Sequence, residues 1–309
     1  MEVRNDSLNG FVLLGFSEMP RLHLHLFSVF LVAYIICVLG NASIFMLIIS
    51  QSQLQTPMYL LMGNLALVDV GFTSATIPRA VYGLLSGDTF ISFHDCFTQL
   101  FFFLAFGNMD SFMLAIMAFD RYSAVCYPLS YLKIMSRKTR VCLVASSCVV
   151  VSLHSTLYVV MNSTRSHCRW VIPHFFCDLP VVMLLSCSAL SPNEQMGVLL
   201  ECAVIILGPV LFILVSYILI IRAVMKLQTS KGRWRTFSTC SSHLTMVVIF
   251  YSTVIFMYFR PSSIYSPTYD RAISVVYCLF IPMLNPFIYS LRNKLVKSAV
   301  KKVLLRGSN

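Results

Sequence analysis

A few acidic residues stand inside or at the ends of long apolar runs, and they are the first candidates for chemistry. Only 11% of the 309 residues are charged, yet Asp120 and Arg121 stand side by side where the run 97–119 ends. Asp69 and Asp110 lie within apolar runs. An ionisable group is costly in such a setting and is by default a functional hypothesis. Two carboxyl groups close together could hold a cation or share a proton.

The pair Asp120-Arg121 is followed by Tyr122. If the preceding run is a helix, an acid at its C-terminal end opposes the helix dipole, which is negative there. We therefore expect Asp120 to need Arg121 as a partner. The alternative is a basic residue at a membrane boundary beside a chance acid, and these three residues alone do not decide between the two.

The composition indicates that the apolar runs lie in a membrane. Hydrophobic residues make up 58% of the chain, and its mean hydropathy is +0.79. A soluble domain carries roughly a quarter charged residues. The sequence predicts an all-α membrane protein, a seven-helix transmembrane bundle forming a single domain. Each predicted span is long enough to cross about 30 Å of hydrocarbon, and the spans are 26–50, 58–84, 97–119, 141–161, 196–221, 237–259 and 272–291.

The basic residues predict the orientation of the bundle. Sixteen of the 23 Lys and Arg residues cluster in three segments, 121–140, 222–235 and 292–306. Basic residues near the ends of spans stay in the cytoplasm. Residues 1–25 are therefore expected outside the cell and the tail 292–309 inside, in a multi-pass protein of the plasma membrane. The net charge of +11 follows from this topology and gives little support for nucleic-acid binding.

The predicted outer side carries the sites for covalent modification. Asn5-Asp6-Ser7 is a glycosylation sequon, and the use of a second match at Asn162 stays open. Four of the eleven cysteines fall on this side, which predicts two disulfides in an oxidising compartment, although three pairings are possible: they are Cys96, Cys168, Cys177 and Cys187.

Seven stretches, in the same order along the chain, carry a resemblance to a known family. They are LLGFSE (13–18), LGN (39–41), PMYLLMGNLALVD (57–69), MAFDRYSAVCYPLSY (117–131), SY (216–217), FSTCSSHL (237–244) and PMLNPFIYSLRNK (282–294). The chain resembles the olfactory receptors, a branch of the rhodopsin-like G-protein-coupled receptors, over nearly its whole length. It departs mildly from that pattern at Asp110, Phe119, Ser123 and Ser252, which bears on specificity and coupling.

The resemblance implies how the chain signals. It implies a small volatile odorant as ligand, a heterotrimeric G protein of the stimulatory olfactory type as partner, and cyclic AMP as the output. It also implies a short amphipathic helix at the C-terminus and the disulfides Cys96–Cys177 and Cys168–Cys187. The residues implied in switching and coupling are Asp120, Arg121, Tyr122, Tyr217, Asn285, Pro286 and Tyr289.

The resemblance further places four polar residues in one hydrated network between helices: Asn41, Asp69, Asp110 and Asn285. A sodium ion bound at Asp69 and Asp110 is one interpretation. A water-filled network that only joins the helices is the other. Prolines 209, 282 and 286 break the helical hydrogen-bond ladder, so we expect kinks where these helices meet the network.

A ligand site is expected in the outer half of the bundle. The spacing of Phe103, Leu104, Gly107 and Asn108 places them on one inward stripe of a helix. Many of the residues that the resemblance places opposite this stripe must also serve as ordinary apolar core. The full set that it places there is Glu201, Cys202, Ile205, Ile206, Tyr251, Val254, Ile255, Tyr258, Val275 and Cys278.

Two absences restrict the ligand. No lysine lies in 272–291, which excludes a retinal Schiff base, and Phe103 stands where receptors for amines carry an acid. A charged amine is thus disfavoured, although Glu201 offers a different anchor. The predicted pocket is mostly apolar, with Asn108, Glu201 and Tyr258 to orient a polar group.

Other functions find less support. A transporter predicts inverted repeats and an even or doubled span count, and an enzyme predicts a catalytic motif such as HExxH, GxSxG or a P-loop; the sequence has none of these. His174, Cys177 and Asp178 resemble a metal motif, but a cysteine in a disulfide is no thiolate ligand. His243 is interpreted as a helix contact. No metal other than sodium and no cofactor is expected.

Overall fold

The computed structural model describes residues 10–16, 20–188, 191, 196, 203–226, 229–258, 266–291, 295, 296 and 298. In this part of the chain seven helical segments are long and apolar enough to cross a membrane: His23–Ser50, Pro57–Ser86, Phe93–Cys126, Arg137–Ser163, Ala203–Met225, Cys240–Met257 and Pro267–Ile288. The predicted all-α bundle is confirmed. The tail 292–309, where we expect an amphipathic helix, lies almost wholly outside the described residues.

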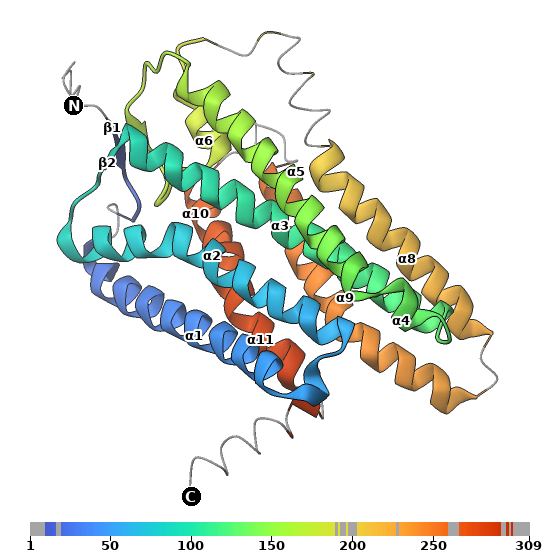
Figure 1. Cartoon of the computed structure of the whole chain (residues 1–309). Helices are drawn as coiled ribbons and strands as arrows, with labels where there is room; N and C mark the ends of the chain where they lie inside the picture. Colours follow the sequence, from blue (N-terminus) through green and yellow to red (C-terminus); the bar gives the residue numbers. More distant parts are fainter. Residues whose placement is uncertain are drawn as a thin grey trace, which may run out of the picture.

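Helix α3 (Phe93–Cys126) runs through the middle of the bundle (Figure 1). It contacts α2 (Pro57–Ser86), α5 (Arg137–Ser163), α8 (Gly208–Met225) and α9 (Ser230–Tyr258). On the other side of α2, α1 (His23–Ser50) packs against α2 and α11 (Ile281–Leu291). Short helices α4 (Tyr131–Ile134) and α6 (Leu179–Leu184) flank α5 in sequence, and α10 (Pro267–Val275) precedes the last span. Residues on α3 therefore reach most of the bundle.

Two prolines coincide with changes in helix type. The π-helix η3 (Ala203–Leu207) precedes Pro209, and a second π-helix, η5 (Val276–Phe280), precedes Pro282. A proline lacks the backbone N–H, and its ring clashes with the carbonyl four residues earlier, which in these cases lies within the π-helix. The wider turn accommodates that interruption. The expected disturbances at Pro209 and Pro282 are thus found as π-helices in the described spans.

A three-stranded sheet, absent from our expectations, caps one end of the bundle. Strand β1 (Gly10–Leu13) pairs antiparallel with β2 (Phe90–Ser92) and parallel with β3 (Val171–Ile172). Phe11 in the central strand is fully buried, with its ring against Phe93 and Trp170. The N-terminal segment is thereby held between the connections that follow α2 and α5.

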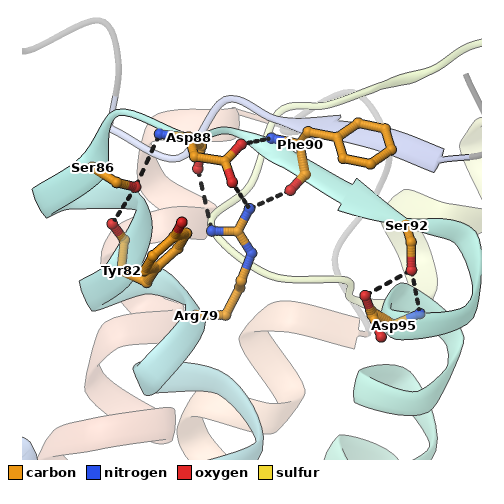
Figure 2. Close-up of polar contacts among 7 residues, drawn as sticks. All are labelled: Arg79, Tyr82, Ser86, Asp88, Phe90, Ser92 and Asp95. Atoms are coloured by element: carbon orange, nitrogen blue, oxygen red, sulfur yellow. Dashed lines mark hydrogen bonds and ion pairs between the residues drawn. The ribbon is translucent and has the colours of Figure 1, made fainter.

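The link from α2 to α3 is stabilised by the polar contacts in Figure 2. The Arg79 guanidinium donates to the backbone oxygens of Asp88 and Phe90 and lies 3.8 Å from the Asp88 carboxylate. Ser92 caps α3 by accepting from the Asp95 backbone N–H at 3.0 Å. One arginine on α2 thus fixes the turn that leads into β2.

Two disulfides connect the cap to the bundle. Cys96 at the start of α3 is bonded to Cys177, and Cys168 to Cys187 within the connection after α5. This is the pairing that the family resemblance implies. The first bond holds that connection over the end of α3, and the Gln99 side chain reinforces it by accepting from the Cys177 backbone N–H at 2.9 Å.

Replacing Gly10 by alanine should release the N-terminal strand. A Cβ at Gly10 would lie 2.3 Å from the Ile91 backbone oxygen, and a paired strand cannot move aside. We expect proteolysis by proteinase K, followed by mass spectrometry, to cleave near Gly10–Leu13 at least several times faster in Gly10→Ala. Gly208→Ala is the control, since its Cβ meets nothing within 4 Å. Equal cleavage in both variants would contradict the prediction.

Candidate functional site

A cavity of about 90 Å³ lies between α2, α3, α5, α6, η3, α9 and η5. Its walls are mainly apolar and aromatic, with a few hydroxyl, amide and imidazole groups. The lining residues are Phe72, Phe103, Leu104, Gly107, Asn108, Ser111, His154, Tyr158, Leu179, Ile205, Ile206, Phe250, Tyr251, Val254 and Tyr277. A partly open space of this character suits a small apolar ligand that carries one polar group.

Eight of the fourteen residues expected at the ligand site line this cavity: Phe103, Leu104, Gly107, Asn108, Ile205, Ile206, Tyr251 and Val254. Glu201 and Cys202 lie outside the described residues, as does the side chain of Tyr258. The four residues of the α3 stripe are all present. The periodicity of one helix therefore located the cavity correctly along α3.

Three expected residues do not line the cavity. Ile255 follows Val254 on α9 and is 47% exposed on the outside of the bundle, because neighbouring residues on a helix point about 100° apart. Val275 and Cys278 lie at the π-helix η5, where the wider turn presents Tyr277 to the cavity. Cys278 is buried elsewhere in the bundle. The cavity lining does not include these three positions, and ligand contact there stays a prediction.

Two hydrogen-bonded pairs give the cavity its polar groups. The Asn108 amide donates to His154 Nδ1 at 3.1 Å, which joins α3 to α5. The Ser111 and Tyr251 hydroxyls lie 2.7 Å apart and join α3 to α9. Sequence reasoning missed His154, although a histidine within an apolar span is itself a signal of function.

Aromatic rings form one wall of the cavity. The Phe103 ring lies 4.8 Å from that of Phe176 and 5.4 Å from that of Phe72, measured between centroids. Tyr277 contacts both Phe103 and Phe72 at about 6 Å. Gly107 is needed beside this wall, because a Cβ there would lie 3.2 Å from the Phe72 ring. The wall is built from packed aromatic rings, and the faces of these rings are apolar.

The four residues of the expected polar network are all buried, and Asp110 lies on α3 between the cavity residues Asn108 and Ser111. The Asn285 amide donates to both carboxylate oxygens of Asp69, at 2.9 and 2.8 Å. Asn41 donates to the Pro282 carbonyl at 3.0 Å. These bonds join α2 to α11 and α1 to α11. Asp110 makes no such bond within the described part of the chain through its Oδ1 atom.

The oxygen atoms of this network are of the kind that binds a hard cation. Asp110 Oδ1 and Asn285 Oδ1 are buried and have no hydrogen-bond partner among the described residues. Oxygen atoms of carboxylate and amide groups are ligands for hard cations. Across the same residues there is no group of three or more His, Cys, Asp or Glu side chains arranged for a metal ion. The set therefore suits a weakly held cation or water better than a transition metal.

At the far end of α3, Asp120 has a different partner from the one expected. The Tyr131 hydroxyl on α4 donates to Asp120 Oδ1 at 2.7 Å. No ion pair within 4 Å joins Asp120 to Arg121 in the described residues, and the role of Arg121 as the partner of Asp120 stays a prediction. Burial, and then the Asp120 carboxylate, raise the pKa of Tyr131 above its ordinary value. Tyr131 thus remains a protonated donor to Asp120, while Arg121 acts on Asp120 through its charge without a direct contact.

Two successive hydrogen bonds, which we call the relay, connect three helices on the Asp120 side of the cavity. The Tyr217 hydroxyl on α8 donates to His243 Nδ1 at 2.7 Å, and His243 Nε2 donates to the Leu114 carbonyl on α3 at 3.0 Å. Because a carbonyl only accepts, the second bond fixes the proton of the ring on Nε2. The interpretation of His243 as a helix contact agrees with these bonds. The side chain of Tyr289 lies outside the described residues.

Comparison with known proteins decides the family. The family model for the olfactory receptors matches residues 30–307. The chain belongs to the olfactory receptor family. It is 44% identical over 306 residues to human olfactory receptor 1L6, covering 98% of this chain and 88% of that protein. With rat olfactory receptor 1f45 it shares 46% identity over 300 residues, 97% and 96% of the two chains.

Membership of the family establishes the general function. The protein is an odorant receptor, a multi-pass protein of the plasma membrane that couples to a G protein, and it is not an enzyme. A dog olfactory receptor-like protein, OLF1, is similar over comparable lengths, at 43% identity and 95% of this chain. The resemblance found in the sequence is thereby confirmed.

Next to the receptor's cavity is a lid, which we define as β1 to β3 together with residues 173–178, and its Phe176 ring packs against Phe103 of the cavity wall. Arg271 on α10 donates to the Gly15 carbonyl, and its guanidinium lies 5.9 Å from the Phe16 ring centroid. His174 Nε2 lies 3.1 Å from the Ser274 hydroxyl. Burial, and then the Arg271 charge, lower the pKa of His174 to about 3. His174 is therefore neutral in the folded lid.

Acid should destabilise the lid through His174. Its pKa is depressed on folding, so this histidine's contribution is complete above the ordinary value of about 6.5 and is lost as pH falls toward 3. We expect the melting temperature of the purified receptor to fall between pH 7.5 and 5, and to fall less in His174→Gln, which keeps an amide near Ser274.

Exposed His94 provides the control. The variant His94→Gln should retain the full pH dependence of the parent. Parallel loss of melting temperature in the parent and in His174→Gln would show that the buried imidazole is not responsible.

Proposed function

We propose that this receptor binds a small, mostly apolar volatile odorant in the cavity and activates a stimulatory olfactory-type G protein, which raises cyclic AMP. The observation that carries the proposal is the cavity itself, an apolar and aromatic enclosure with two hydrogen-bonded pairs among its walls. The N-terminal side, with the sequon at Asn5, faces outward in this proposal, and the basic clusters face the cytoplasm.

The small volume of the cavity implies that the ligand displaces side chains that line it. A volume of about 90 Å³ is below the roughly 150 Å³ of an engineered cavity that holds benzene. An odorant with about ten heavy atoms therefore requires the enclosing side chains to shift. At roughly 0.6 kcal/mol per atom such a ligand gains about 6 kcal/mol, which corresponds to a dissociation constant of tens of micromolar.

Movement of α9 links ligand binding in the cavity to the residues that contact the G protein. Tyr251, on the cavity wall, and His243, in the relay to Leu114, lie eight residues apart on this helix, which is about 12 Å. A ligand that separates Tyr251 from Ser111 frees α9 from α3 at the cavity. The relay at His243 then rearranges, and Arg121, with Asp120 and Tyr122, contacts the G protein. In this proposal Tyr217, Asn285, Pro286 and Tyr289 take part in the same rearrangement.

The buried acids support a resting state held by a cation. In this proposal a sodium ion lies at Asp69 and Asp110, where Asn285 Oδ1 supplies a further oxygen. The ion is coordinated by Asp110 Oδ1 and Asn285 Oδ1, which have no hydrogen-bond partner among the described residues. Its positive charge also reduces the repulsion between the two carboxylates. Loss of the ion would favour rearrangement of α2, α3 and α11 together.

Shortening the aromatic wall should weaken the odorant response. Phe103→Ala removes the ring that contacts Phe72, Phe176 and Tyr277, and we expect a shift of tenfold or more in the half-maximal concentration, or about 1.4 kcal/mol. Dose–response curves of cyclic AMP, with surface expression matched, measure this. Ile255→Ala is the control, because Ile255 faces outward. A shift in the control alone would locate the ligand elsewhere.

Removing Arg121 should separate binding from signalling. Arg121→Ala lies at the opposite end of α3 from the cavity, so we expect odorant binding to persist while cyclic AMP production falls to the basal level. Binding is measured on purified receptor by displacement of a labelled odorant, and cyclic AMP is measured in cells. Undiminished cyclic AMP from a normally expressed variant would contradict the proposed role.

A further inference from the structure

A second hollow lies on the outside of the bundle, between α3, α5 and α8. It encloses about 630 Å³, and we call it the membrane groove. Its rim carries large side chains that are exposed on membrane-spanning helices, among them Val150, Val204 and Phe212. Two serines, Ser146 and Ser147, are its polar residues, and each donates its hydroxyl to the Leu143 carbonyl within α5. The groove therefore offers an apolar surface to the bilayer.

One side chain lines both the membrane groove and the ligand cavity. Ile205 lines both hollows, while its neighbour Val204 lines only the groove and Ile206 only the cavity. On α3, Ser111 lines the cavity and the adjacent Phe112 lines the groove. The two spaces are thus adjacent at the same level of the bundle, and Ile205 is their shared wall.

The backbone at this wall departs from the regular α-helical hydrogen-bond pattern. Ile205 is the central residue of π-helix η3. Pro209, four residues later, has no N–H to donate to the Ile205 carbonyl, and its ring disfavours a regular turn there. Gly208 has no side chain, and a Cβ there would meet no heavy atom within 4 Å. Displacement of Ile205 therefore breaks no regular helical bond to residue 209 and meets open space at residue 208.

The described part of the lid covers the cavity on its other side. Phe176 is fully buried against Phe103, and Leu179 closes the cavity beneath the Cys96–Cys177 disulfide. A ligand that enters through this part has to displace a cross-linked, packed layer. A ligand that enters from the membrane groove has to displace one isoleucine.

We propose that the membrane groove takes up small apolar odorants from the bilayer and passes them to the ligand cavity by displacement of Ile205. This inference rests on the proposed function of the cavity. The occupant follows from the apolar lining and from continuity with the cavity through Ile205. Each methylene group moved from water to hydrocarbon favours the lipid by roughly fourfold, so a ligand with six of them is concentrated about a thousandfold or more beside the groove.

Filling the groove tests the route without altering the cavity. Gly208→Phe places a ring in the open space at residue 208, and Leu211→Phe adds a similar ring to the same helix at a residue that is 61% exposed and does not line the groove. The full-length receptor is held in phosphatidylcholine nanodiscs, mixed with an octyl diazirine probe and flashed with light after increasing delays. Mass spectrometry then locates the labelled residues.

We expect the parent and Leu211→Phe to be labelled first in the groove, at Phe112 or Phe212, and then in the cavity, at Ile206 or Val254. In Gly208→Phe labelling of the cavity should be delayed tenfold or more, although it reaches the same plateau, because a blocked route changes rates and leaves the equilibrium unaltered. Ile205→Ala, which opens the shared wall, should shorten the delay.

Three results would overturn the inference. One is cavity labelling at the parental rate in Gly208→Phe together with an unaltered rate in Ile205→Ala. Another is a groove that phospholipid occupies, shown by cavity labelling with no labelling of the groove in the parent. The third is a parent whose cavity takes no label at any delay. This last result would also remove the binding half of the proposed function, whereas the first two would leave it intact.

Discussion

In hydrocarbon every backbone amide has to find its partner within the protein, and this constraint underlies the rest of the receptor. It requires each span to be a helix. Each proline within a span then leaves one backbone carbonyl without its usual hydrogen-bond partner. The problem is met by π-helices before Pro209 and before Pro282. Both π-helices contribute to the cavity, through Ile205 and Tyr277. Two of the positions where the helical ladder is interrupted thus contribute side chains to the cavity.

The same solvent gives single hydrogen bonds an organising role between helices. Each buried polar pair connects two different spans: Asn108–His154 joins α3 to α5, Ser111–Tyr251 joins α3 to α9, Tyr217–His243 joins α8 to α9, and Asp69–Asn285 joins α2 to α11. A net contribution of about 1 kcal/mol per bond is enough to favour one arrangement and small enough for a ligand to exchange it. Three of these four pairs involve α3 or α9, the helices that connect the cavity with the cytoplasmic end.

The sequence was sufficient for the spans and for the α3 face of the cavity, because apolar length and a helical repeat are local signals. It was insufficient for Ile255, Val275 and Cys278, since the angular position of a residue on α9 or η5 depends on packing and on helix type. The partner of Asp120 was missed for a related reason: Tyr131 approaches from a separate helix, α4, and no local pattern announces that contact. The sheet at the capped end was also missed, because its strands are short and come from three distant segments.

That sheet has a consequence for how the receptor is made. The middle strand, β1, is synthesised first, but one of its partners begins at Val171, about 160 residues later. At about 5–20 residues per second, translation alone separates the two by roughly ten to thirty seconds. During this interval the Phe11 ring, which ends fully buried, has no completed sheet to cover it. The first strand to be made therefore waits for the last one, and the fold at the N-terminal end is completed only after a segment from the middle of the chain has been synthesised.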